Sequence, residues 1–240
     1  MTRRLKIAIV GTGISANGAA YRLAPHHDLT VFEKQNRLGG HSNTVEVDYD
    51  GVHIPVDTGF IVYNEFNYPQ LTQLFAELGV ETQESDMSFG VSTMNGRFEW
   101  SGRTVDSVFS QRRNLFSPGF LFMLREIFRF NRLAREDLSN GLDGGVSLGE
   151  YLESRGFSSR FRRDYLLPMG AAIWSTPASE MLRFPARSFL DFFRNHRLID
   201  DDRPSWRTVT GGSRVYVEKL TAAFADRIRL GTGVAQARRH

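Results

Sequence analysis

The chain has 240 residues, of which 41% are hydrophobic and 24% charged, and its formal net charge is +3. This composition is ordinary for a globular protein that is large enough to bury a core. The absence of cysteine excludes disulfides, thiolate catalysis and cysteine-based metal sites, and we expect no metal centre. No apolar run approaches the roughly 20 residues that a membrane-spanning helix needs, and the N-terminal apolar run is too short for a signal peptide. The cytoplasm is therefore the expected location.

The first elements predict a dinucleotide-binding βαβ unit. An apolar run over residues 7–10 ends in the glycine motif of residues 11–16, GTGISA, and a helical pattern follows. A second apolar run over residues 29–32 ends in Glu33. In such a unit the glycines make a tight turn and let the backbone approach a pyrophosphate, the helix N-terminus faces the phosphates, and the acid accepts hydrogen bonds from a ribose hydroxyl. The alternative is a doubly wound fold that uses its glycines only for the turn.

The residues after Glu33 narrow the choice of cofactor. Arg37 is followed by Leu38, Gly39 and Gly40, and an arginine before paired glycines can close over a pyrophosphate from the side opposite the helix. Alternating residues on either side of Asp50-Gly51 then predict a β-hairpin with a type I′ turn.

These segments resemble a known family. GTGISA, FEKQNRLGG and VDTGF are similar to the flavin amine oxidase and phytoene desaturase-like superfamily, and GGHSNTVEVD and VDTGFIVYNE resemble its bacterial branch of NAD/FAD-binding oxidoreductases. The resemblance runs along the whole chain but covers only the N-terminal portion of the family pattern. It implies FAD as the cofactor and an α/β fold. That fold is a Rossmann-like domain of the glutathione-reductase type with an inserted, mostly helical substrate domain, and its C-terminal part is missing from this sequence.

Carried over position by position, the resemblance implies a cofactor site. The glycine motif would line the pyrophosphate, Glu33 would bind the adenosine ribose, and the loop of residues 37–40 would cover the phosphates. Residues 41–44 and 58–60 would lie near the ribityl chain and the flavin ring, although His41 stands where many amine oxidases have arginine. The residues expected at the cofactor are Gly11, Gly13, Ile14, Ser15, Ala16, Glu33, Lys34, Arg37, Gly39, Gly40, His41, Thr44, Thr58, Gly59, Phe60 and Val234. Each of these residues could instead have a purely structural role: Phe60 could belong to the core, for example, and Thr44 could be an ordinary strand residue.

The predicted organisation is interleaved. Residues 1–65 and 205–240 are expected to form an incomplete, discontinuous FAD-binding domain, with residues 66–204 as the substrate-domain insertion. Helices are predicted over 69–78 and 214–226, a second hairpin turns at Asn95-Gly96, and residues 106–195 are mostly helical. A cofactor sheet that lacks a strand would expose an unpaired edge, so a second chain that completes the fold is a further expected partner.

Residues 103–135 are strongly basic. Their acidic residues are Asp106 and Glu126, and their seven arginines are Arg103, Arg112, Arg113, Arg125, Arg129, Arg132 and Arg135. On a helix over 118–138 the apolar arc comprises Phe120, Met123, Leu124, Ile127, Phe130 and Ala134. The simpler interpretation is that this arc packs inward and leaves the arginines in water. The alternative is a peripheral contact with an anionic membrane surface that admits a lipid substrate. We expect no nucleic-acid partner, because no known binding module accompanies the arginines.

The expected function is an FAD-dependent oxidoreductase that takes a hydride from an apolar substrate (a lipid acyl chain or polyene) or from an amine. The basic, aromatic middle of the chain favours a lipid over a polyamine, whose site would need acidic residues. We assign no catalytic residue, since the flavin itself would carry the chemistry. The segment from Pro168 to Pro177 is the best candidate for a pocket wall, with Trp174 as a core aromatic the alternative. A second functional class is a non-catalytic or truncated nucleotide-binding or lipid-carrier protein of the same fold.

Overall fold

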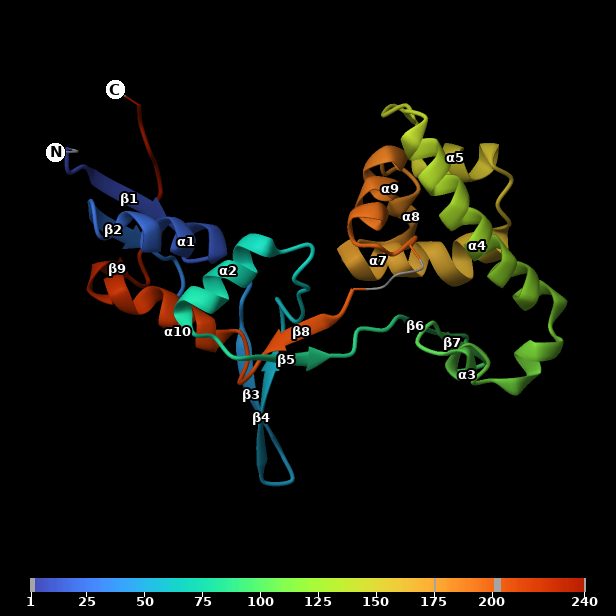
Figure 1. Ribbon diagram of the computed structural model, residues 1–240, viewed down its shortest axis with the longest axis horizontal. Helices are drawn as coiled ribbons and strands as arrows, with labels where there is room; N and C mark the ends of the chain where they lie inside the picture. The colour runs from blue at the N-terminus through green and yellow to red at the C-terminus, as the bar shows by residue number, and fades with distance from the viewer. Residues whose placement is uncertain (1–2, 175, 201–203, 240) are drawn as a thin grey trace. The chain divides into compact units, whose positions relative to one another are not determined.

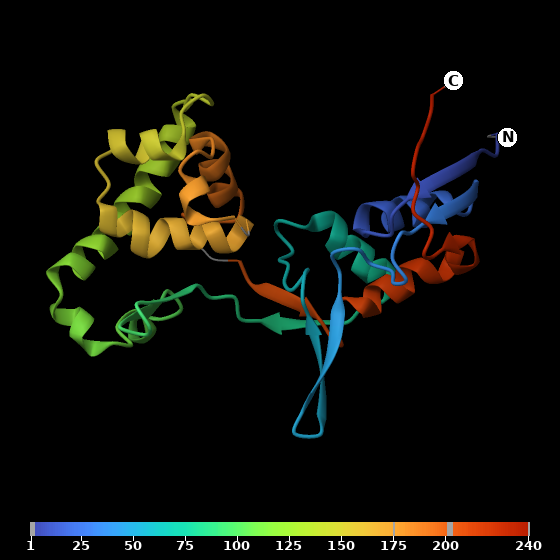
Figure 2. The ribbon, with the colours of Figure 1, turned by 180° about the vertical axis from the view of Figure 1, so that it is seen from behind.

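The computed structural model describes residues 3–174, 176–200 and 204–239. They form two compact units, residues 1–86 with 205–240 and residues 87–204 (Figure 1 and, from behind, Figure 2). The first boundary lies at Asp86 and not at residue 65, because the segment after residue 65 joins the first unit. In that segment β5 (Thr82–Ser85) pairs with β8 (Trp206–Val209), and the two strands are antiparallel.

A parallel sheet in the first unit confirms the predicted α/β class and its βαβ order. Its strands are β1 (Lys6–Val10), β2 (Asp28–Phe32) and β9 (Ile228–Arg229), in the order β1-β2-β9. Helix α1 (Ile14–Leu23) joins the first two strands. The core beside this sheet contains Ala20, Ala24, Leu29, Val31 and Phe224. Within the described residues β1 is paired on one side only, and Val10 is 64% exposed.

A second core in the first unit fixes its other helices. Helix α2 (Pro69–Leu78) ends at Gly79 with a left-handed backbone, and α10 (Arg214–Thr221) continues into the 3-10 helix η3 (Ala222–Arg227). Phe75 of α2 packs against Tyr216 of α10, with ring centroids 5.2 Å apart. The predicted helix over 214–226 is therefore two segments, since the backbone leaves helical geometry at Phe224.

The predicted hairpin is a two-stranded ribbon of β3 (Thr44–Tyr49) and β4 (Val52–Asp57), which projects from the rest of the first unit in Figure 1. Asp50 and Gly51 at its turn have positive φ angles of 52° and 82°, as a type I′ turn requires. The cross-strand pairs that share its apolar face are Val45 with Val56, Val47 with Ile54 and Tyr49 with Val52. All six of these side chains are exposed.

The second unit is a hairpin followed by helices packed around an aromatic core. Strands β6 (Gly90–Thr93) and β7 (Phe98–Ser101) turn at the predicted Asn95-Gly96. The remaining elements are α3 (Val105–Val108), η1 (Arg112–Phe116), α4 (Pro118–Ser139), α5 (Leu148–Ser154), α6 (Ser159–Phe161), η2 (Arg162–Leu166), α7 (Leu167–Trp174), α8 (Ala178–Met181) and α9 (Ala186–Asn195). Among the described residues, no helix is both long and apolar enough to cross a membrane.

The predicted pocket wall belongs to this aromatic core. The Trp174 ring lies 4.7 Å from Phe192 and 5.3 Å from both Phe184 and Phe189, measured between ring centroids. These contacts support the alternative interpretation of Trp174 as a core aromatic. Ser175 of the same segment lies outside the described residues.

Candidate dinucleotide site

The start of α1 has the form of an anion-binding site. Gly13 is its N-cap residue, no side chain caps it in the described structure, and its first turn carries no acid. The first N–H groups of a helix point outward without intrahelical partners, and the helix dipole makes this end positive. Gly13 itself has an ordinary φ of −68°, and a Cβ added there would meet no atom within 4 Å. Open space therefore lies over the helix start, and neither protein packing nor backbone conformation demands a glycine at that position.

Glu33 lies at the carboxyl end of β2, and its carboxylate is held toward the glycine turn. Its Oε2 accepts hydrogen bonds from the Thr12 N–H at 2.9 Å and the Thr12 hydroxyl at 2.5 Å, and its Oε1 accepts one from the Gln35 N–H at 2.8 Å. Burial acts to raise the pKa of Glu33, but the hydrogen bonds from Gln35 and Thr12 outweigh it and hold that pKa below its ordinary value. The carboxylate is thus ionised at neutral pH.

The loop of residues 37–40 packs onto the same turn. The Gly39 N–H donates to the Thr12 carbonyl oxygen at 3.1 Å. A Cβ added to Gly40 would lie 2.9 Å from the Gly13 Cα, and Gly40 has a φ of +58°. Arg37 is exposed, and its Nη1 donates only a long bond of 3.5 Å to the Leu38 carbonyl. The structure thus places the loop backbone beside the helix start, with the Arg37 side chain at the surface.

Residues 41–44 and 58–60 lie side by side. The Thr58 N–H donates to the Asn43 carbonyl at 2.9 Å, and the Phe60 N–H donates to the His41 carbonyl at 3.4 Å. A Cβ at Gly59 would meet the His41 carbonyl oxygen at 2.0 Å, so this approach requires glycine. The geometry therefore brings these two segments together, while their proximity to a flavin ring stays a prediction.

Two of these residues have structural partners already. The Thr44 hydroxyl donates to Asp57 Oδ1 at 2.6 Å and accepts from the Arg214 N–H at 3.0 Å, at the start of α10. The Phe60 ring packs edge-on against Tyr216 at 6.5 Å. The plainer alternatives for Thr44 and Phe60 are thus supported by contacts within the protein.

The segment after β9 runs beside Glu33. The Gly231 N–H donates to the Gln35 carbonyl at 3.1 Å, and the Thr232 N–H donates to the Glu33 carbonyl at 2.7 Å. Gly233 follows, where an added Cβ would lie 3.5 Å from Lys34 Cγ, and the next residue, Val234, is exposed. The chain end and the β2 end, almost 200 residues apart in sequence, thus form one edge of the site.

Sequence reasoning missed the residue that connects these parts. Thr12 is fully buried; its N–H and hydroxyl bind Glu33, and its carbonyl accepts from Gly39 and from Asn17 Nδ2. The available signal was its place between the two glycines of the turn, two residues after the end of β1. Asp57 was missed as well, although it stands in the VDTGF segment.

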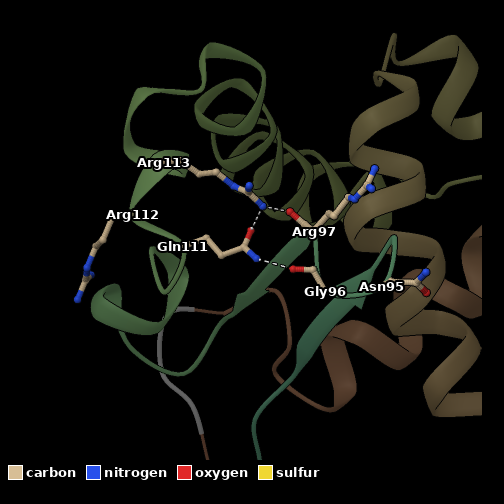
Figure 3. Close-up of a pocket in the computed structure, with 6 residues that line it drawn as sticks. All are labelled: Asn95, Gly96, Arg97, Gln111, Arg112 and Arg113. Carbon is tan, nitrogen blue, oxygen red and sulfur yellow. Dashed lines mark hydrogen bonds between the residues drawn. The ribbon is translucent and has the colours of Figure 1, made fainter.

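The second unit contains a different, basic hollow lined by Asn95, Gly96, Arg97, Gln111, Arg112 and Arg113 (Figure 3). Gln111 Nε2 donates to the Gly96 carbonyl at 2.9 Å, and the Arg113 guanidinium donates to the Arg97 carbonyl and to Gln111 Oε1. Figure 3 shows Arg112 and Arg97 pointing away from Arg113 on opposite sides. The three guanidinium groups do not converge, so this hollow is no candidate for a second anion site.

Comparisons with known proteins agree with this geometry. A family model described as an NAD(P)-binding Rossmann-like domain matches residues 9–78. The 4,4'-diapophytoene desaturase (4,4'-diaponeurosporene-forming) of Staphylococcus aureus strain Newman is 42% identical over 45 residues, which are 18% of this chain and 9% of the desaturase. The same values hold for the desaturase of strain USA300.

Solved structures match nearly the whole chain. A double mutant of putrescine oxidase has a TM-score of 0.62 at 22% identity, and cyclohexylamine oxidase from Brevibacterium oxydans has 0.64 at 18% identity. Each match covers 95% of this chain and 51% of the other, so the chain spans about half the length of these oxidases. An oxidoreductase from Methanosarcina mazei is similar over 96% of this chain, with a TM-score of 0.58 at 16% identity. The local match to the desaturase agrees with the resemblance inferred from the sequence, and at these identities the solved structures establish the fold alone.

Proposed function

We propose that this chain binds FAD at the start of α1 and belongs to an FAD-dependent oxidoreductase. The observation that carries the proposal is the ionised Glu33 carboxylate, fixed by Thr12 and Gln35 beside the open space over Gly13. An acceptor for ribose hydroxyls and an uncapped helix start are the two groups that an adenosine diphosphate moiety needs.

The charge at Glu33 limits the choice of nucleotide. A carboxylate that accepts from a ribose 2′-hydroxyl would repel a 2′-phosphate, so FAD and NAD fit and NADP does not. The loop of residues 37–40, packed onto Gly13, offers a second wall for the pyrophosphate. The similarity in fold to two amine oxidases and the local identity to a desaturase favour FAD over NAD.

Bound FAD would supply hydride acceptance from the substrate and reoxidation by a separate acceptor. The residues of this chain would hold and orient it. The first N–H groups of α1 would bind the pyrophosphate, Glu33 would fix the ribose, and the paired segments 41–44 and 58–60 would lie toward the ring. For the substrate we propose an apolar acyl chain or polyene, with an amine as the variant, on the basis of the desaturase and oxidase similarities.

The test is titration of the purified chain with FAD, followed by calorimetry. We expect saturable binding of FAD, weaker binding of NADP, and an affinity for FAD that falls about 10- to 100-fold in Glu33→Gln, since one charge-assisted hydrogen bond is lost. The matched control is Glu84→Gln, which changes an exposed glutamate on β5 of the same unit and leaves the affinity unchanged.

FMN serves as the internal comparison because it lacks the adenosine. Any affinity for FMN should be the same in the native chain and in Glu33→Gln. If the folded native chain binds no FAD, the proposal is wrong, and the non-catalytic or lipid-carrier alternative replaces it.

A further inference from the structure

Helix α4 has an exposed face on which apolar and basic side chains alternate. Its inner face, with Phe120, Met123, Phe130 and Ala134, is fully buried in the second unit, as the sequence pattern predicts. The face on the other side, here called the Phe-Arg face, comprises Leu121, Phe122, Arg125, Phe128 and Arg132, all of them exposed. At 100° per residue, Leu121, Arg125, Phe128 and Arg132 fall within a narrow sector, and Phe122 borders it.

The apolar part of this face is unusually open. Phe128 is 72% exposed and Phe122 is 52% exposed, and Phe116, which ends η1 just before α4, is 86% exposed. An aromatic side chain that covers nothing in its own fold leaves a large apolar surface in water, and single exposed residues are normal whereas a contiguous group indicates a binding surface.

The charge around this face is positive on balance, since Arg132 pairs with the exposed Glu136 at 3.1 Å whereas Arg125 adds a positive charge of its own. The other two acids of α4 are buried: Glu126 accepts from the Ser158 N–H at 2.7 Å and from the Ser158 hydroxyl, and Asp137 accepts from the Tyr151 hydroxyl at 2.9 Å. Asp106 is paired with Arg112 at 2.7 Å. Among the described residues Arg125 has no ion-pair or hydrogen-bond partner, although it lies between Phe122 and Phe128 one turn away on each side.

We propose that the Phe-Arg face binds the surface of an anionic lipid bilayer. Phenylalanine rings can enter the boundary between headgroups and acyl chains, while arginines on the same helix keep their charged ends among lipid phosphates. A helix lying in the plane of the interface needs this mixed composition along one face, and each basic residue near an anionic surface adds attraction. The net positive charge of the face, which comes from Arg125 because Glu136 offsets Arg132, complements the negative charge of the lipid and selects this partner.

The experiment is flotation of the whole chain with vesicles of phosphatidylcholine, alone or with about 30% phosphatidylglycerol, at low and at high salt. We expect the chain to float with the anionic vesicles at low salt, to float much less at high salt, and to stay behind with pure phosphatidylcholine. Phe122→Ser with Phe128→Ser, and separately Arg125→Glu, should each lower the partition coefficient about 10-fold or more.

Matched controls change exposed residues of the same kinds elsewhere. Ile61→Ser with Phe66→Ser removes two exposed apolar side chains of the first unit that lie outside the β3–β4 ribbon, and Arg238→Glu reverses a charge near the chain end. These variants should float like the native chain. Circular dichroism and thermal unfolding check that every variant is folded. Absence of flotation at low salt, or an equal loss in the control variants, would overturn the proposal. An unchanged partition coefficient in the Phe-Arg variants would also overturn it, because the chain would then reach the vesicles through another surface or by self-association.

Discussion

Gly13 and Gly40 both belong to the site, but a larger side chain is disfavoured at each for a different reason. This difference can be measured. Gly13 faces open space with an ordinary φ, whereas a Cβ on Gly40 would press on the Gly13 Cα at 2.9 Å. We predict that Gly13→Ala changes the free energy of unfolding by no more than about 1 kcal/mol. The same methyl group should lower the affinity for FAD at least about 10-fold, because it occupies the space proposed for the pyrophosphate. Thermal unfolding and FAD titration measure the two effects.

Gly40→Ala is the counterpart, and it should destabilise the protein even without ligand. The left-handed backbone at Gly40 disfavours any other residue by about 1–2 kcal/mol, and the steric contact with Gly13 adds to this cost. An equal loss of stability in Gly13→Ala would show that the space over Gly13 is needed by the protein and not by a ligand.

Glu33 should also make stability depend on pH. Because its pKa is lowered in the folded chain, its contribution is fully present above the pKa that it has when unfolded. That contribution disappears as the pH falls through the lowered value. We predict that the native chain melts at a higher temperature than Glu33→Gln at about pH 7, and that the difference shrinks as the pH is lowered below the ordinary titration range of a glutamate. A difference that stays constant over this range would mean that Glu33 titrates identically in both states.

At the scale of elements, the N-terminus of α10 depends on a residue from another part of the chain. Asp57, at the end of β4, accepts from the Ser213 N–H through both carboxylate oxygens at 2.9 Å and from the Ser213 hydroxyl at 2.8 Å. Thr44 is bound to the same carboxylate. A helix cap of this kind joins the ribbon to the helix across more than 150 residues of sequence.

We predict that Asp57→Ala lowers the free energy of unfolding by about 1–3 kcal/mol, since a cap is lost and buried donors are left unpaired. The control is Asp226→Ala, an exposed aspartate in η3 of the same unit, with an expected change within about 0.5 kcal/mol. Urea unfolding measures both. Equal changes in the two variants would contradict the assigned cap.

Local sequence patterns predicted the helices and strands well, but they did not predict contacts between segments that are distant in sequence. Asp50-Gly51 and Asn95-Gly96 identified both hairpins because a type I′ turn depends on two adjacent residues. The glycine motif and Glu33 identified the βαβ unit because their order and spacing along the chain are also a local pattern. The cap from Asp57 to Ser213 and the pairing of β5 with β8 could not be found this way, because their partners are distant in sequence and no local pattern marks them. The sequence therefore predicts a boundary at residue 65, whereas the pairing of β5 with β8 extends the first unit to Asp86.

For the whole molecule, each of the two units has its own core. A ligand that binds the first unit should therefore change amide hydrogen exchange in that unit and not in the second. The core of residues 186–195 in the second unit contains Phe189, Leu190 and Phe193, all fully buried. The proposed site instead consists of a turn, a helix start and a loop in the first unit. The backbone amides of such exposed segments exchange hydrogen with solvent when the structure opens locally. A bound ligand suppresses that opening, more strongly as its occupancy rises.

We therefore predict that FAD slows amide hydrogen exchange most strongly over residues 11–17 and 33–40 and leaves residues 186–195 unchanged. At a ligand concentration about 100 times the Kd, linkage gives up to about 2.7 kcal/mol of added protection where opening requires release of the ligand. Exchange followed by mass spectrometry on native chain and Glu33→Gln measures this pattern, which should weaken in the variant at equal FAD. Protection confined to the second unit would place the ligand away from α1 and contradict the proposed site, whatever the affinity.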